Sequence, residues 1–127
     1  MLATQQLHRL AVEKCNGSSL DALWELLAPL HRGWTNVPQA LIGDFESRSQ
    51  SFFWLLERLL REGHIKLHKN GVFYESPIDE QVEMFRRAFP ESEKKSGYED
   101  FYWWFFDDEC PAGVAWRQAD GSYQIAD

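Results

Sequence analysis

Residues 98–109 place seven aromatic side chains in nine positions and then end on three consecutive acids. At protein interfaces, aromatic side chains supply buried contact area, and carboxylates at the rim attract cationic partners. A helical or an extended conformation leaves aromatics on both sides of such a segment. One side can therefore complete the core, while the other must meet another element or a partner.

The stretch is expected to divide its side chains between these two tasks. Trp104 and Phe105 are predicted to complete the core, although Trp and Phe are common enough in cores that all of the rings could be buried. The predicted partner contacts are Trp103, Asp107, Asp108 and Glu109, with Glu99 and Asp100 as electrostatic support.

Charge is distributed unevenly along the 127 residues, whose formal net charge is -7. Residues 1–90 carry ten Lys/Arg and eleven Asp/Glu, whereas residues 91–127 carry three and nine. An acidic field repels phosphate groups and attracts cations, so it disfavours binding to nucleic acid or to an anionic membrane. The expected partner is a basic protein.

Catalytic motifs are absent from the sequence. It has no G-x-S-x-G elbow, phosphate-binding glycine loop or local cysteine signature, so we expect no enzyme activity and no cofactor. His64 and His68 flank Lys66, with Glu75 expected across the strand pair. Strand residues four apart lie about 13 Å from each other, too far for a shared zinc ion, and no metal site is predicted.

An alternative function follows from the order of elements between Phe52 and Glu75. A helix, a strand, a basic tip and a second strand form the recognition helix and wing of winged-helix proteins. Here the wing would carry Lys66, His68 and Lys69. Residues 57–69 hold four Lys/Arg against two acids, which is a small excess for a phosphate-binding surface. A DNA-binding or regulatory role is the alternative.

Composition indicates one folded domain spanning residues 1–127, because 44% of the residues are hydrophobic and 15% are aromatic. The two cysteines, Cys15 and Cys110, show neither C-x-x-C nor metal spacing and are expected to be reduced thiols. The N-terminus lacks signal-peptide features, and no apolar run approaches the ~18 residues of a membrane span. We expect a cytoplasmic protein.

Helical periodicity predicts four helices. They are expected over residues 2–15, from Ser18 to a last turn near Pro29, from the serines at 47–51 to Gly63, and from Ser76 to Pro90. The third has a broad apolar stripe and an i,i+4 pair between Glu57 and Arg61. Glycine and proline between residues 31 and 44 predict a loop.

Two β-hairpins complete the predicted α+β fold, in which about four helices pack on a small antiparallel sheet. The first has Asn70-Gly71 at its turn, a pair that suits type I′, and this register places Leu67 opposite Tyr74. The second turns at Asp120-Gly121. Its register is expected to put four apolar side chains on one face: Val114, Trp116, Tyr123 and Ile125.

Four blocks of the sequence resemble a small bacterial family of unknown function. They are S-L-D-A-L-W at 19–24, R-E-G-x-I-K-L at 61–67, I-D-E-Q-V-x-x-F-R-x-A-F-P at 78–90 and W-F-F-x-x-E-C-P-x-G at 104–113. Members of that family are often encoded beside secreted or contact-dependent toxins and are taken as immunity proteins. The resemblance implies a non-catalytic protein that neutralises a cognate basic toxin, such as a nuclease, by stoichiometric binding.

Overall fold

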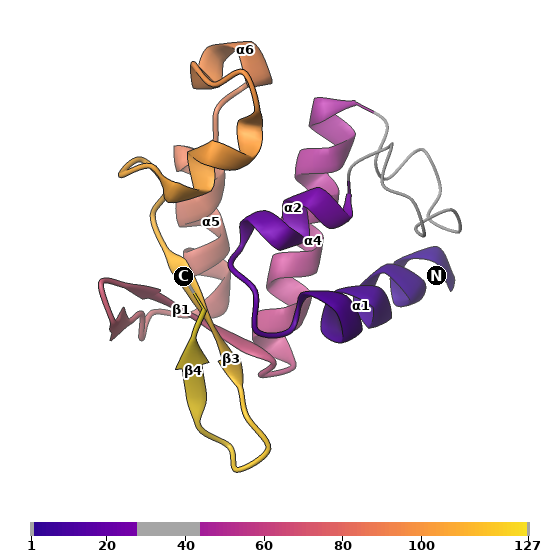
Figure 1. Cartoon of the computed structure of the whole chain (residues 1–127), viewed down its shortest axis with the longest axis vertical. Coiled ribbons are helices and arrows are strands. Elements are labelled where there is room, and N and C mark those ends of the chain that lie inside the picture. The colour runs from indigo at the N-terminus through magenta and orange to yellow at the C-terminus, as the bar shows by residue number, and fades with distance from the viewer. Residues whose placement is uncertain (1, 28–43, 127) are drawn as a thin grey trace.

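The computed structural model describes residues 2–27 and 44–126, which form helices and a four-stranded antiparallel sheet that lies to one side of them (Figure 1). The helices are α1 (Leu2–Cys15), α2 (Asp21–Leu26), α4 (Phe45–Arg61), α5 (Ile78–Ala88), α6 (Glu93–Ser96) and the 3₁₀ helix η1 (Phe101–Phe106). The strands are β1 (Ile65–Lys69), β2 (Val72–Phe73), β3 (Gly113–Arg117) and β4 (Tyr123–Ile125). The predicted α+β class is confirmed, whereas most of the predicted loop, with Pro29, lies outside the described residues.

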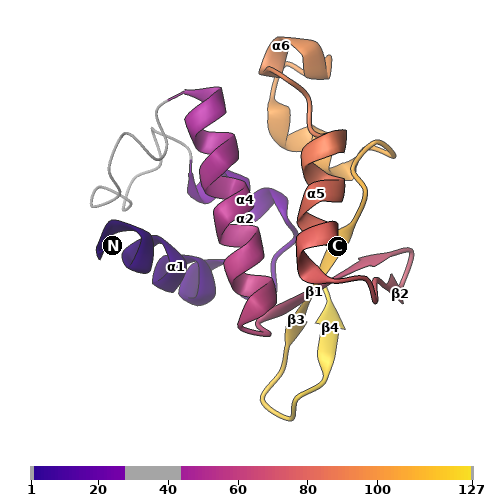
Figure 2. The same cartoon turned by 180° about the vertical axis from the view of Figure 1, so that it is seen from behind.

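Helix α4 lies between α1 and α5 (Figure 2) and contacts both of them as well as α2. Its apolar stripe, which includes Phe52 and Leu56, is fully buried. The Asp44 carboxylate caps its first turn by accepting a hydrogen bond of 2.7 Å from the Ser47 amide. Gly63 follows its last turn with a φ of +76°, a conformation that favours glycine. Helix α4 was thus predicted correctly, except that it begins at Phe45.

Ser18 and Ser76, at which two helices were predicted to start, were also expected to cap them, and both caps are wrong. Leu20 occupies the cap position of α2 and makes no side-chain cap, while the Ser19 hydroxyl donates to the Asp21 carboxylate. Pro77 occupies the cap position of α5, and the side-chain Nε2 of Gln81 donates to the Ser76 carbonyl at 2.7 Å. Each helix therefore begins after the predicted cap.

The sheet has the order β2-β1-β3-β4, so the two hairpins are joined along β1 and β3. The first hairpin is as predicted, since Asn70 and Gly71 have φ angles of +53° and +85°. The Tyr74 amide donates to the Leu67 carbonyl at 3.0 Å, which confirms the predicted register.

The second hairpin has a different register from the predicted one. Its turn is closed by a hydrogen bond of 3.0 Å from the Gly121 amide to the Gln118 carbonyl, and Arg117 pairs with Tyr123. The loop therefore has three residues and not the two of the predicted turn. Because side chains alternate between the two faces of a sheet, this extra residue moves each side chain of β4 to the face opposite the predicted one. Tyr123 and Ile125 consequently lie on the opposite face from the buried Trp116.

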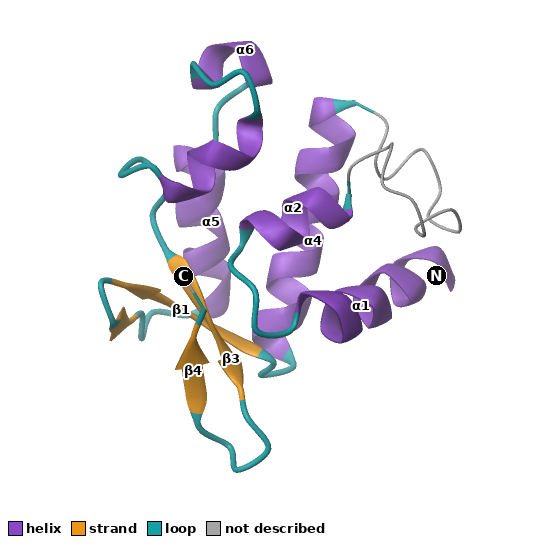
Figure 3. Cartoon of the chain, in the orientation of Figure 1, coloured by secondary structure: helices purple, strands orange, loops and turns teal. Residues whose placement is uncertain are grey.

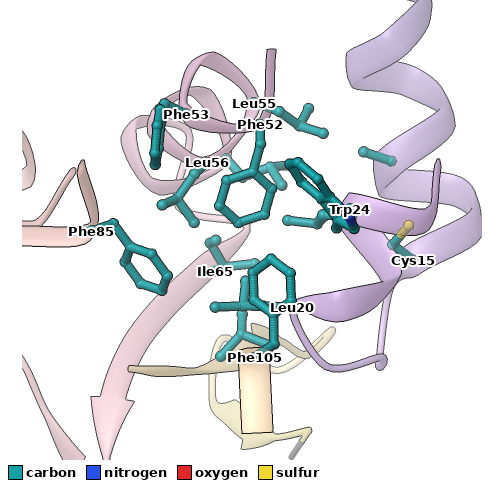
Figure 4. Packing of buried hydrophobic residues seen from close by; sticks show 14 of the residues in the cluster. Cys15, Leu20, Trp24, Phe52, Phe53, Leu55, Leu56, Ile65, Phe85 and Phe105 are labelled. Carbon is teal, nitrogen blue, oxygen red and sulfur yellow. The ribbon is translucent and has the colours of Figure 1, made fainter. Parts of the chain in front are cut away.

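One buried apolar cluster joins the helices to the sheet, as Figure 4 shows in part. The Trp24 ring lies 4.9 Å from the ring of Phe101 and 6.1 Å from that of Phe52. The Trp116 indole donates to the Ser18 carbonyl at 2.8 Å, which ties the sheet to the segment before α2.

The two cysteines are buried and are not joined to each other. Burial raises the pKa of Cys15 to about 11, so this thiol stays protonated at neutral pH. No helix in the described part of the chain is long and apolar enough to cross a membrane.

Candidate functional site

Helix η1 sorts the aromatic side chains onto two sides of the chain. It connects α6 to the loop that leads to β3 (Figure 3). A 3₁₀ helix has three residues per turn, so side chains three apart lie above each other. Phe101 and Trp104 form one such pair, buried and stacked at 5.7 Å, and Phe105 is buried beside them. Trp104 and Phe105 are thus core residues, as predicted.

The last of the three pairs at this spacing in η1 faces solvent. Trp103 and Phe106 are each 52% exposed, and their ring centroids lie 6.0 Å apart. Tyr102 is half-buried and completes the group, with its ring 4.5 Å from that of Trp103. We call Tyr102, Trp103 and Phe106 the exposed aromatic cluster. The sequence prediction included Trp103 but missed Phe106, which a three-residue period would have paired with it.

The predicted acids lie at both ends of η1 and differ in what they contact. Glu99, Asp100, Asp108 and Glu109 are exposed, whereas Asp107 is half-buried. In the described part of the chain, none of these exposed carboxylates forms an ion pair. Their negative charge is therefore available to a partner.

Two of the acids also hold η1 in place. Asp100 is the N-cap and accepts a hydrogen bond of 3.3 Å from the Tyr102 amide. Asp107 accepts from the Tyr98 hydroxyl and, at 3.0 Å, from the Glu109 amide. The bond from Tyr98 is the largest of the effects that hold the pKa of Asp107 below its usual value. Asp107 is consequently a positioning residue as well as a charge.

Helix α2 adds acids that sequence analysis did not assign to this surface. It contacts η1, and the pKa of Tyr102 is raised first by desolvation and then by the charges of Asp100, Asp21 and Glu25. Asp21 and Glu25 are one turn apart on the polar side of α2, whose other side buries Trp24. That spacing was visible in the sequence, but the packing of α2 against η1 was not.

A cleft of about 260 Å³ lies beside the exposed aromatic cluster. It lies between the end of η1 and the tip of the first hairpin, and its lining includes Phe106, Asp107, Asp108, His68, Lys69 and Asn70. The Lys69 ammonium group donates to the Cys110 carbonyl at 3.2 Å. The cleft therefore offers an aromatic and carboxylate wall to a partner side chain.

A separate group of polar side chains forms where α4 leads into β1. His8 Nε2 lies 2.8 Å and His64 Nε2 lies 3.5 Å from the same oxygen of Glu62, Oε2. His68, which sequence analysis placed too far from His64 to share a metal ion, is buried and accepts a hydrogen bond of 3.1 Å from the Gly71 amide at its Nδ1. His8 was missed, because only the packing of α1 brings it to Glu62.

A family model described as a protein of unknown function, DUF596, matches residues 60–125. The chain belongs to the DUF596 family. The matched region holds the whole sheet, α5, α6 and η1, so it contains the exposed aromatic cluster and most of its acids. Resemblance to a family of unknown function is therefore confirmed, while the association with toxins stays a prediction.

A solved structure supports the fold of this DUF596 protein. It is described as an uncharacterized protein conserved in bacteria, from Neisseria meningitidis, and is similar to this chain with a TM-score of 0.72 and 25% identity. The similarity covers 94% of this chain and 84% of that one, so it extends beyond the DUF596 region. The chain matches none of the curated proteins compared with it.

Proposed function

We propose that this DUF596 protein is a non-catalytic binding module, an immunity protein that neutralises a basic toxin by stoichiometric binding in the cytoplasm. The observation that carries the proposal is the exposed aromatic cluster with acids on either side of it. Two large rings, Trp103 and Phe106, are each half exposed at the centre of this surface.

The aromatic cluster would supply most of the binding free energy. Tryptophan is among the residues enriched at interface positions whose truncation costs more than about 2 kcal/mol. A rigid ring loses little side-chain entropy on binding, and Trp103 and Phe106 already contact each other across 6.0 Å. The cluster is thus arranged to enter an apolar pocket of a partner without rearrangement.

The acids would direct and orient the partner. Exposed carboxylates at an interface rim raise association rates and exclude partners of like charge. Asp108 and Glu109 follow the cluster, and Glu99 precedes it. A toxin that acts on nucleic acid carries a cationic cleft, which is complementary to this surface.

The winged-helix alternative has weaker support. Helix α4 occupies the position of the recognition helix, yet it buries eight residues and packs against three other helices. Two of its cations are paired, Arg58 with Glu62 at 2.6 Å and Arg61 with Glu57 at 3.0 Å. The Lys66 ammonium group lies 4.6 Å from the centroid of the Tyr123 ring. These groups are partly engaged before any phosphate approaches.

Co-expression tests the proposed function. The partner would be the C-terminal domain of a secreted toxin encoded beside this chain, and the wild-type chain should restore growth to cells that produce that domain. The double variant Trp103→Ser/Phe106→Ser should lose the rescue. The control Val72→Ser changes a side chain that is 73% exposed on β2 and should keep it.

Each failure has a separate meaning. If the wild-type chain gives no rescue, the immunity function is rejected. If the double variant rescues as well as the wild type, the exposed aromatic cluster is not the binding surface. For the winged-helix alternative, a gel shift of duplex DNA at low salt would support DNA binding in place of the proposed function.

A further inference from the structure

Three side chains that can bind a metal ion meet at the junction of α1, α4 and β1. His8 lies in α1, Glu62 is the C-cap residue of α4, and His64 immediately precedes β1. Gly63, between Glu62 and His64, has a φ of +76°, so the chain turns sharply there and brings its two neighbours to the same side. Their three ligand atoms all lie within 4.8 Å of one another.

We propose that His8, Glu62 and His64 bind one zinc ion. Tetrahedral zinc with ligands at about 2.0–2.2 Å places those ligand atoms roughly 3.3–3.5 Å from each other. Nε2 of His64 already lies 3.5 Å from Oε2 of Glu62, and Nε2 of His8 lies at 2.8 Å. Small rotations of the two imidazole rings would open space for the ion between the three atoms.

The donor set selects the kind of metal. Two imidazole nitrogens with one carboxylate suit zinc and its transition-metal neighbours, whereas calcium and magnesium prefer sites made of oxygen. Among these metals we propose zinc, because its filled d shell imposes no coordination geometry and it readily binds mixed ligands in a tetrahedral arrangement.

The hydrogen bonding of Glu62 favours coordination through one of its two oxygens. The Arg58 guanidinium donates to Oε1 of Glu62 at 2.6 Å, which leaves Oε2 for the ion. The positive charge of Arg58 would weaken the binding of a cation but would not block Oε2.

Three protein ligands would leave a fourth position open. An open cleft of about 410 Å³ adjoins the site and is lined by His8, Arg9, Val12, Glu13, Arg58 and His64. Closed structural zinc sites use four protein ligands, whereas sites with three keep a place for water or another small ligand. The ion would also link α1 to the α4–β1 junction, so it would stabilise the packing of the first helix.

Zinc titration of the full chain by calorimetry tests this site, which is separate from the surface around η1. The wild-type chain should bind one equivalent, and zinc should raise its melting temperature. His8→Gln and His64→Gln should each weaken binding by about tenfold or more, because even loss of an outer-shell group costs about 10–100-fold. The control Glu57→Gln changes a carboxylate of α4 that is paired with Arg61, and it should bind zinc like the wild type.

Cobalt substitution provides a readout that does not depend on the stability of a variant. Tetrahedral cobalt bound to nitrogen and oxygen gives visible absorption without the thiolate charge-transfer band that Cys15 or Cys110 would produce. Absence of stoichiometric zinc binding to the folded wild-type chain would overturn the proposal. A thiolate band, or unchanged affinity in both histidine variants, would overturn it equally.

Discussion

The Tyr98 hydroxyl donates a hydrogen bond to the Asp107 carboxylate, and these two residues stand on either side of η1. The bond thereby clamps the two ends of the segment that presents the exposed aromatic cluster. It is the largest cause both of the raised pKa of Tyr98 and of the lowered pKa of Asp107.

Replacing Tyr98 by Phe should raise the pKa of Asp107 toward the usual value of about 3.9. The lowered pKa means that ionised Asp107 favours the folded state. The stability that ionised Asp107 gives to the folded protein is therefore present above the unfolded-state pKa, and it is lost as the pH falls through the folded-state pKa. Carbon NMR titration of the carboxylates would measure the shift. The pKa of Asp44, which is lowered by hydrogen bonding with Ser47, should not change, and an unchanged Asp107 would show that the bond is absent in solution.

Replacing Trp103 and replacing Trp104, which are neighbours in η1, should have very different effects on the free energy of unfolding. Trp104→Ala should lower the free energy of unfolding by about 3–5 kcal/mol, because it opens a cavity around a fully buried ring. Trp103→Ala removes a ring that is 52% exposed and should change stability by about 0.5 kcal/mol or less. Urea denaturation would measure both variants. Equal losses would mean that Trp103 is covered in solution and cannot serve as a contact residue.

Trp116→Phe should cost about 1–3 kcal/mol through the lost hydrogen bond and the space left behind. The buried indole of Trp116 donates to the Ser18 carbonyl, 98 residues away in the sequence. Trp103→Phe removes the same atoms at the surface and is the matched control. A similar result for the two variants in denaturant titrations would argue against the contact between β3 and the segment before α2.

The double variant Asp108→Ser/Glu109→Ser should slow association with a basic toxin domain by about tenfold at low salt, with a smaller effect on dissociation. Both acids are exposed beside the exposed aromatic cluster. Surface plasmon resonance at several salt concentrations separates the two rates. The control Asp79→Ser/Glu80→Ser removes the same charge from the start of α5. If both pairs slow association equally, net charge alone steers the partner.

Local chemistry made some parts of the fold predictable from sequence. Asn70-Gly71 was predicted correctly because positive φ at both positions is the requirement of one turn type. Asp120-Gly121, by contrast, is compatible with both a two-residue hairpin turn and a three-residue hairpin loop. The bond from Gly121 to Gln118 selects the longer loop, and nothing in the neighbouring sequence distinguishes the two.

The candidate site was predictable only in part. The composition of the aromatic stretch identified the segment, but its division depends on the three-residue period of η1, which neither an α-helix nor a strand has. Asp21 and Glu25 join this surface through the packing of α2. His8 meets Glu62 through the packing of α1. Such neighbours depend on tertiary contacts, which periodicity along the chain does not contain.

The order of the sheet also sets how this chain must fold. Each hairpin closes locally, and an isolated hairpin forms in about 1–10 μs. β1 and β3, however, pair across the entire segment that contains α5, α6 and η1, and such distant pairing is slow. The buried rings of residues 98–106 are covered by other parts of the chain, since Phe101 packs on Trp24 and Phe105 on Phe52. Until these distant contacts form, the segment proposed to bind a partner also exposes core rings to other copies of the chain.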